Sequence, residues 1–240
     1  MDEIKAKGAE DMCKKRIIIS TAVLLLAAVV LTALIFFLVE KSKPRTYEEK
    51  VAAFVEKNLT LKQGQIVFIG DSMTERYKLD RAYKDLDLEV YNRGISGDTA
   101  TWLQARLGVS LFDLAPSKVV LMIGTNDINY GRSAEEIAGD YESILHLIRQ
   151  NLPDAKIWCV SIVPQNTDYS EGAAQNNAQI REANEKIKAL ACSYGLEYVD
   201  LYSLLVDENG LLNGAYSTDG LHLNHRGYAV WTNALKERLQ

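Results

Sequence analysis

The most apolar stretch of the chain covers residues 17–39. It holds 23 residues without a charged side chain, and its only polar members are Ser20, Thr21 and Thr32. A helix of this length rises about 35 Å, which is enough to cross the hydrocarbon core of a bilayer with some tilt. No small-residue cleavage site follows, so we predict an uncleaved signal anchor. A long cleaved signal or a buried core helix are the alternatives.

The residues that flank this stretch predict its orientation. Lys14, Lys15 and Arg16 stand directly before it. Because cytoplasmic flanks carry the excess of Lys and Arg, we expect the N-terminus inside and residues 45–240 outside the cytoplasm. Residues 1–44 carry seven basic and five acidic side chains, so the remainder of the chain is acidic. An acidic domain is more easily placed outside an anionic membrane than on its surface.

Beyond residue 63, short apolar runs alternate with amphipathic stretches. The runs are rich in β-branched residues, and most of them end at a glycine, an asparagine or a proline. The expected strands are 65–69, 88–91, 118–123, 156–163 and 197–201, and the expected helices are 99–107, 134–151, 173–193 and 225–239. This alternation predicts an α/β fold with a five-stranded parallel sheet and helices on both faces.

Between the apolar stretch and the first strand we expect a linker and one helix. Thr46 and Glu49 fit a capping box for a helix over 47–58. An apolar stripe along it is expected to pack on the domain or to space the domain from the membrane. The stripe consists of Val51, Ala52, Phe54 and Val55. The predicted organisation is a cytoplasmic stub at 1–16, an anchor at 17–39, a linker and helix at 40–63, and an α/β domain at 64–240.

Composition narrows the class of protein. Of the 240 residues, 48% are hydrophobic and 25% charged, which excludes collagen-like and disordered chains. The net charge of −5 offers no basic surface for nucleic acid. Three cysteines are too few for a disulfide framework. Cys13 is expected on the cytoplasmic stub, and Cys159 and Cys192 are expected to be small buried hydrophobic residues.

Four polar segments follow the predicted strands or precede the last helix. They begin at Gly70, Gly94, Gly124 and Asp219, and they read GDSM, GISGD, GTND and DGLH. In parallel sheets, ligands bind beyond the carboxyl ends of the strands. We therefore expect the four segments to meet at one edge of the sheet and to carry the chemistry.

Ser72, in the first segment, is a candidate nucleophile and needs a neighbouring base. The chain has three histidines. His146 lies within an amphipathic helix, and His225 stands near the start of the last helix, so neither is the expected base. His222 follows Asp219 by three residues, and that carboxylate can hold the imidazole in the required tautomer.

An attacking serine also needs donors for the oxyanion that forms. Ser72 sits at a strand-to-helix turn and can offer its own N–H. Gly97 lets the backbone approach a ligand closely, so its N–H is a second donor. The side-chain amide of Asn126 is a third. Each residue alone could be an ordinary turn or capping residue. The whole set, however, occurs in order within one domain.

In this combination the sequence resembles the SGNH/GDSL hydrolase family of esterases and lipases, over essentially the whole α/β domain. Ser72 matches the nucleophile block, Gly97 the glycine block, Asn126 the asparagine block, and Asp219 with His222 the last block. The resemblance implies a flavodoxin-like three-layer α/β/α sandwich. It implies Ser72 as nucleophile, His222 as base and Asp219 as its orienting group. It also implies an oxyanion hole formed by Ser72, Gly97 and Asn126.

The expected function is that of a membrane-tethered serine ester hydrolase. It would remove small acyl groups, with acetyl favoured, from an extracytoplasmic carbohydrate or lipid ester. The segments between the strands are short and contain no large lid insertion, which favours an open site. Lysophospholipase, thioesterase and acyltransferase activities use the same triad and are alternatives. A non-catalytic binding module on a membrane stalk is an alternative of another class.

No cofactor and no metal is expected. Asp219, His222 and His225 are spaced by three residues, but no further cluster of ligands accompanies them. Three aromatic residues fall near the predicted catalytic edge, where they either line an acyl or sugar pocket or cover the sheet. These are Trp102, Tyr130 and Tyr169.

Overall fold

The computed structural model describes residues 30–31 and 46–240. Residues Tyr47–Gln240 form one compact unit. The anchor predicted at 17–39 lies outside the described residues, apart from Val30 and Leu31. Within the described part of the chain, no helix is both long enough and apolar enough to cross a membrane.

Five parallel strands form a single sheet, which confirms the predicted fold class. The strands are β1 (Ile66–Gly70), β2 (Val90–Gly94), β3 (Lys118–Met122), β4 (Lys156–Val160) and β5 (Glu197–Val199). Their order is β2-β1-β3-β4-β5, and every neighbouring pair is parallel. Gly70 lies opposite Gly94 on one side and Met122 on the other, so the central strands end together at one edge.

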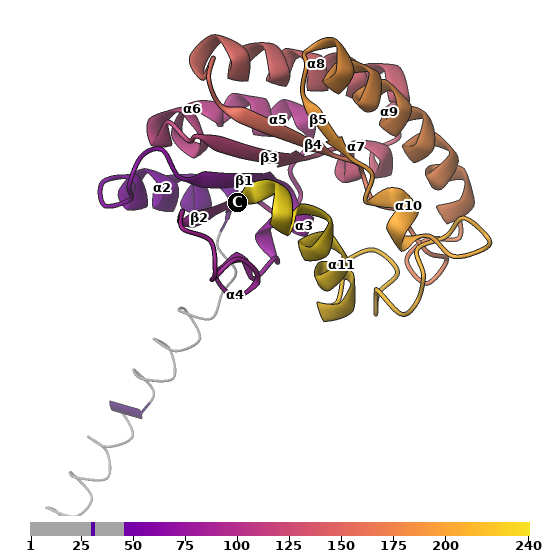
Figure 1. Ribbon diagram of the computed structural model, residues 1–240. Helices are drawn as coiled ribbons and strands as arrows, with labels where there is room; N and C mark the ends of the chain where they lie inside the picture. The colour runs from indigo at the N-terminus through magenta and orange to yellow at the C-terminus, as the bar shows by residue number, and fades with distance from the viewer. Residues whose placement is uncertain (1–29, 32–45) are drawn as a thin grey trace, which may run out of the picture. The chain divides into compact units, whose positions relative to one another are not determined.

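Helices cover both faces of the sheet and complete a three-layer sandwich (Figure 1). The helices of the first face are α5 (Ala100–Ala105), α6 (Leu107–Ser110), α8 (Ala134–Asn151) and α9 (Ala173–Ser193). Ile69 and Leu121 of the sheet share one buried core with Ile137 of α8 and Ile180 of α9. This core joins the two long helices to the central strands.

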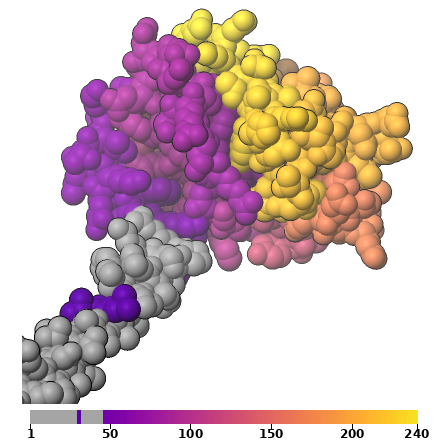
Figure 2. All heavy atoms as spheres, turned by 90° about the horizontal axis from the view of Figure 1, so that it is seen from below, coloured from indigo at the N-terminus to yellow at the C-terminus, as the bar shows by residue number. Residues whose placement is uncertain are grey.

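The second face is covered by shorter helices and by the C-terminal end of the chain. These helices are α3 (Ser72–Glu75), α4 (Leu79–Ala82) and α11 (His225–Leu235). The Phe68 ring of β1 packs against Tyr77, Tyr83 and Trp231, with centroids 5.9, 5.3 and 6.4 Å away. Figure 2 looks at the molecule from this side, with the C-terminal residues in yellow. The remaining elements are α2 (Tyr47–Asn58), η1 (Phe112–Leu114), α7 (Thr125–Asn129), α10 (Tyr202–Leu205) and η2 (Lys236–Leu239).

The long helices α8 and α9 begin and end where the sequence pattern predicts. For α8 the cause is local, because Ser133 and Glu136 form a reciprocal capping box at its start. The helix expected over 99–107 is instead divided into α5 and α6 at Arg106. The last predicted helix ends at Leu235 and continues as the 3₁₀ turn η2.

The strand predicted over 156–163 is shorter than expected, because β4 ends at Val160. Ser161 still donates to the carbonyl of Val199 in β5, and from Ile162 a side chain replaces the neighbouring strand. Asn184 of α9 accepts the N–H of Ile162 at 2.8 Å and donates to its carbonyl at 2.9 Å. Both backbone polar groups of this buried residue are therefore satisfied by one amide side chain.

Burial corrects two details of the sequence analysis. Cys159 is buried as predicted, but the prediction for Cys192 is wrong, because it is exposed on α9. Its neighbour Ala191 lies on the buried face of the helix, and one residue further turns the side chain away from the core. In α2 the predicted stripe is only half correct: Val51 and Phe54 are half-buried, whereas Ala52 and Val55 are exposed.

Candidate active site

Ser72 begins helix α3 directly after strand β1 and Asp71. The Asp71 carboxylate caps this helix, since its Oδ1 accepts the N–H of Met73 at 2.9 Å. Gly94 lets strand β2 approach closely, because a Cβ there would lie 2.2 Å from the backbone nitrogen of Glu75. Ser72 is therefore held at the edge of the sheet, with 6% of its surface exposed.

Two hydrogen bonds connect Ser72, His222 and Asp219 in a line. Nε2 of His222 lies 3.1 Å from Oγ of Ser72, and Nδ1 lies 2.8 Å from Oδ2 of Asp219. Burial raises the pKa of Asp219, but hydrogen bonds from the imidazole and from two backbone N–H groups outweigh it and lower the pKa to about 2. An ionised carboxylate only accepts, so Nδ1 carries a proton and Nε2 can take one from Ser72.

The donors predicted for an oxyanion also lie at this edge. Gly97 has a φ of +89°, a region that favours glycine. A Cβ at Gly97 would meet no atom within 4 Å, so the positive φ rather than a lack of space favours glycine there. Asn126 donates one amide hydrogen to the carbonyl of Asp98 at 2.8 Å and retains a second. In the part of the chain that the structure describes, no hydrogen bond takes up the N–H of Ser72 or of Gly97.

A buried arginine, which the sequence analysis missed, ties these segments together. Arg106 is 2% exposed and pairs with Asp98 at 2.6 Å. Its guanidinium also donates to the carbonyls of Gly70 and Arg93, at 3.0 and 2.9 Å. Asp98 follows Gly97, and Gly70 precedes the turn that carries the serine. No motif marks Arg106, because in a hydrophobic pattern an arginine predicts an exposed position.

Three of the polar segments each carry a buried carboxyl group, at Asp71, Asp98 and Asp127. Asp127 accepts a hydrogen bond from Arg132 at 2.9 Å. Burial raises the pKa of Asp98 to about 6, against the effect of its ion pair, so it is ionised at neutral pH. Burial raises the pKa of Asp71 to about 7, against the hydrogen bond from Met73. Asp71 therefore titrates near neutrality, directly beside Ser72.

The predicted aromatic residues lie at the surface rather than over the sheet. Trp102, Tyr130 and Tyr169 are 51, 66 and 42% exposed. The Tyr169 hydroxyl accepts a hydrogen bond from Asn129 at 3.1 Å, and its backbone lies against Gly220, between Asp219 and His222 in sequence. Trp102 stands on α5, Tyr130 directly follows α7, and Tyr169 lies in the loop against Gly220.

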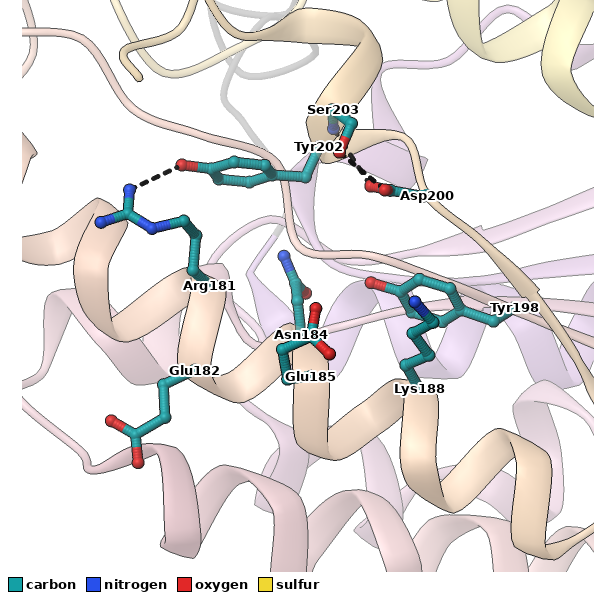
Figure 3. A pocket seen from close by; sticks show the side chains of 9 residues that line it. All are labelled: Arg181, Glu182, Asn184, Glu185, Lys188, Tyr198, Asp200, Tyr202 and Ser203. Carbon is teal, nitrogen blue, oxygen red and sulfur yellow. Dashed lines mark hydrogen bonds between the residues drawn. The ribbon is translucent and has the colours of Figure 1, made fainter. Parts of the chain in front are cut away.

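The pocket in Figure 3 lies away from these residues. It measures about 400 Å³ between α9 and the segment after β5, and none of the four polar segments lines it. Arg181 donates to the hydroxyl of Tyr202 at 3.3 Å, and Ser203 bonds to Asp200 at 2.6 Å. These two bonds occupy four of its polar side chains, and we assign no ligand to the pocket. No group of three or more metal-binding side chains occurs among residues 30–31 and 46–240.

Comparison with known proteins agrees with this geometry. The model of the GDSL-like lipase/acylhydrolase family matches residues 68–230. The chain belongs to this family. It is therefore a hydrolase that acts on acyl groups, and the resemblance seen in the four segments is confirmed. The matched region contains all the site residues named above.

Relatives and solved structures of the family cover most of the chain. The alpha2 subunit of platelet-activating factor acetylhydrolase IB from Rattus norvegicus is 31% identical over 180 residues, 73% of this chain and 76% of the relative. A Streptococcus pneumonia protein, provisionally described as a platelet activating factor, superposes with a TM-score of 0.74. It is 30% identical and covers 89% of this chain and 99% of its own. A GDSL-like lipase from Bacteroides thetaiotaomicron, 25% identical, gives a TM-score of 0.70 and covers 79% of this chain and 96% of its own.

Proposed function

We propose that the protein is a membrane-tethered serine ester hydrolase that removes small acyl groups, above all acetyl, from an extracytoplasmic carbohydrate or lipid ester. The hydrogen-bonded line from Asp219 through His222 to Ser72 carries the proposal. The relatives named acetylhydrolases support the acetyl group. The apolar residues 17–39, with the basic residues before them, support a tether that places the catalytic unit outside the cytoplasm.

In the acylation step, Nε2 of His222 accepts the proton of Ser72 as Oγ attacks the ester carbonyl carbon. The carbonyl oxygen becomes an oxyanion, to which the N–H groups of Ser72 and Gly97 and the second amide hydrogen of Asn126 donate. His222 then passes its proton to the leaving alcohol oxygen as the C–O bond breaks. The ionised Asp219 stabilises the imidazolium between these two transfers.

Deacylation repeats the same proton transfers, with a water molecule as the nucleophile in place of Ser72. His222 takes a proton from the water, whose oxygen attacks the carbonyl carbon of the acyl-enzyme. The same donors stabilise the second oxyanion. When the bond to Oγ breaks, His222 returns the proton to Ser72, and the carboxylic acid leaves.

The segments between the strands are short and hold no large lid insertion, which favours short acyl groups. A lysophospholipase or a thioesterase would use the same residues on a longer or different acyl donor. An acyltransferase would replace water with a sugar hydroxyl. A pure binding module is less well supported, because a module without catalysis has no use for a complete and correctly spaced triad.

The test uses the full-length chain in detergent with activated esters from acetyl to decanoyl. We expect Ser72→Ala and His222→Ala each to abolish nearly all turnover, and the double variant to lose little more, because triad members act as a unit. His225→Ala is the matched control and should keep wild-type turnover. Wild-type turnover in a folded Ser72→Ala protein would refute the serine mechanism. A higher kcat/KM for decanoyl than for acetyl would favour a lipase instead.

A further inference from the structure

Helix α2 lies outside the matched family region, which begins at residue 68, yet it belongs to the compact unit. No residue of α2 is fully buried. Its half-buried positions include Tyr47, Lys50, Phe54 and Asn58, which are spaced by three or four residues and share one face. Tyr47 donates to the carbonyl of Trp102 at 3.2 Å. The other three side chains form two routes of contacts toward the active site.

The first route starts at Lys50. Its ammonium group pairs with Glu75 at 2.7 Å, at the end of helix α3. Oε2 of Glu75 accepts the N–H of Ser96 at 2.6 Å and also the Ser96 hydroxyl. Burial raises the pKa of Glu75, but the bonds from Lys50 and Ser96 outweigh it and lower the pKa. Ser96 directly precedes Gly97, so this route ends at the backbone that carries the Gly97 N–H.

The second route starts at Phe54. Its ring centroid lies 4.4 Å from Cζ of Arg93 and 5.9 Å from Cζ of Arg106. Burial and repulsion from the neighbouring Arg106 cation lower the pKa of Arg93 to about 10. The electron-rich face of the ring offsets part of this repulsion. Arg93 also donates to Oδ1 of Asn58 at 2.5 Å. Arg106, which the same ring contacts, pairs with Asp98 on the other side of Gly97.

We propose that α2 is a positioning element of the active site. Through Lys50 and Phe54 it holds the Ser96–Asp98 loop from both sides, so that the Gly97 N–H stands where the oxyanion forms. This inference rests on the proposed ester hydrolysis. Oxyanion donors act through preorganised geometry, and small displacements cost rate without changing the nucleophile or the base.

The experiment compares full-length Lys50→Ala and Phe54→Ala with two controls at exposed positions, Val55→Ala on the same helix and Leu59→Ala directly after its end. We expect both test variants to lower kcat about tenfold and to change KM less than twofold, since a fully lost donor costs about 10²–10³. Ser72 should react with a fluorophosphonate to the same end point but about tenfold more slowly, because the phosphoryl oxygen uses the same hole. The controls should stay within twofold of wild type.

Two further outcomes separate positioning from a merely structural role. The acid limb of the pH profile should not move, because Asp219 and His222 are untouched. Lys50→Arg should restore most of the lost rate. If Phe54→Ala does not fold, the kinetics of Phe54→Leu and Lys50→Ala test the role of α2 instead. Unchanged kcat and labelling rate in folded test variants would refute the role of α2. A wild-type protein without ester turnover or Ser72 labelling would instead refute the proposed function.

Discussion

At the scale of single residues, the oxyanion site depends on N–H hydrogens that no acceptor in the described part of the chain takes up. Asn126 has committed one amide hydrogen to the Asp98 carbonyl, and only the second can serve a substrate. We predict that Asn126→Ala lowers kcat by about 10²–10³, as expected for the loss of one oxyanion donor. Steady-state kinetics on an acetyl ester would measure this. Asn129→Ala, on the same short helix, is the control, and an equal loss there would contradict the assignment.

Asp71 gives a prediction on stability rather than rate. Its pKa is about 7 in the folded protein and 3.8 for a free carboxyl, so between these values only the folded state holds the proton. Stability therefore falls as pH rises from about 4 to 7, and the full cost is present above 7. Asp71→Asn cannot ionise and can still accept the N–H of Met73. Its stability relative to wild type should rise between pH 4.5 and 8.

Urea unfolding of wild type and Asp71→Asn at both pH values measures this difference. Asp168→Asn is a control at an exposed carboxyl. A difference between Asp71→Asn and wild type that does not change with pH would show that the Asp71 carboxyl does not titrate in this range.

At the scale of elements, side chains complete hydrogen bonding where regular structure stops. Asn184 of α9 satisfies both backbone groups of Ile162 after β4 ends. Asn184→Ala would leave a buried N–H and a buried carbonyl without partners, so we predict a loss of about 1–3 kcal/mol in unfolding free energy. Urea unfolding measures it, with Gln175→Ala on the exposed face of α9 as the control. A loss as small as that of the control would mean that water replaces the amide.

At the scale of the whole molecule, we predict that the catalytic unit works outside the cytoplasm. Trypsin added to intact cells or spheroplasts should cut after Arg45 and release an active fragment of residues 46–240, because the polar linker is basic and precedes α2. Lysed cells provide the control for cleavage. Complete protection in intact cells, with cleavage only after lysis, would reverse the predicted orientation.

Much of this molecule follows from sequence because the controlling interactions are local. The five apolar runs, the two long amphipathic helices and the capping box at Ser133 are each determined by nearby residues, and the strand ends that carry Ser72, Gly97 and Asn126 follow from the alternation. The short helices α4, α7 and α10 were not expected, because four or five residues are too few to show a helical period.

Other features exist only in the tertiary structure, because they join residues far apart in the chain. The 3.1 Å contact between Ser72 and His222 spans 150 positions, and only the folded sheet edge creates it. Arg106 became buried because Asp98 and two strand-end carbonyls surround its charge, which no hydrophobic pattern encodes. The docking of α2 on the oxyanion loop depends on ion pairs and a ring under two cations. Such contacts leave no periodic trace in a sequence, so only the fold could place α2 beside the active site.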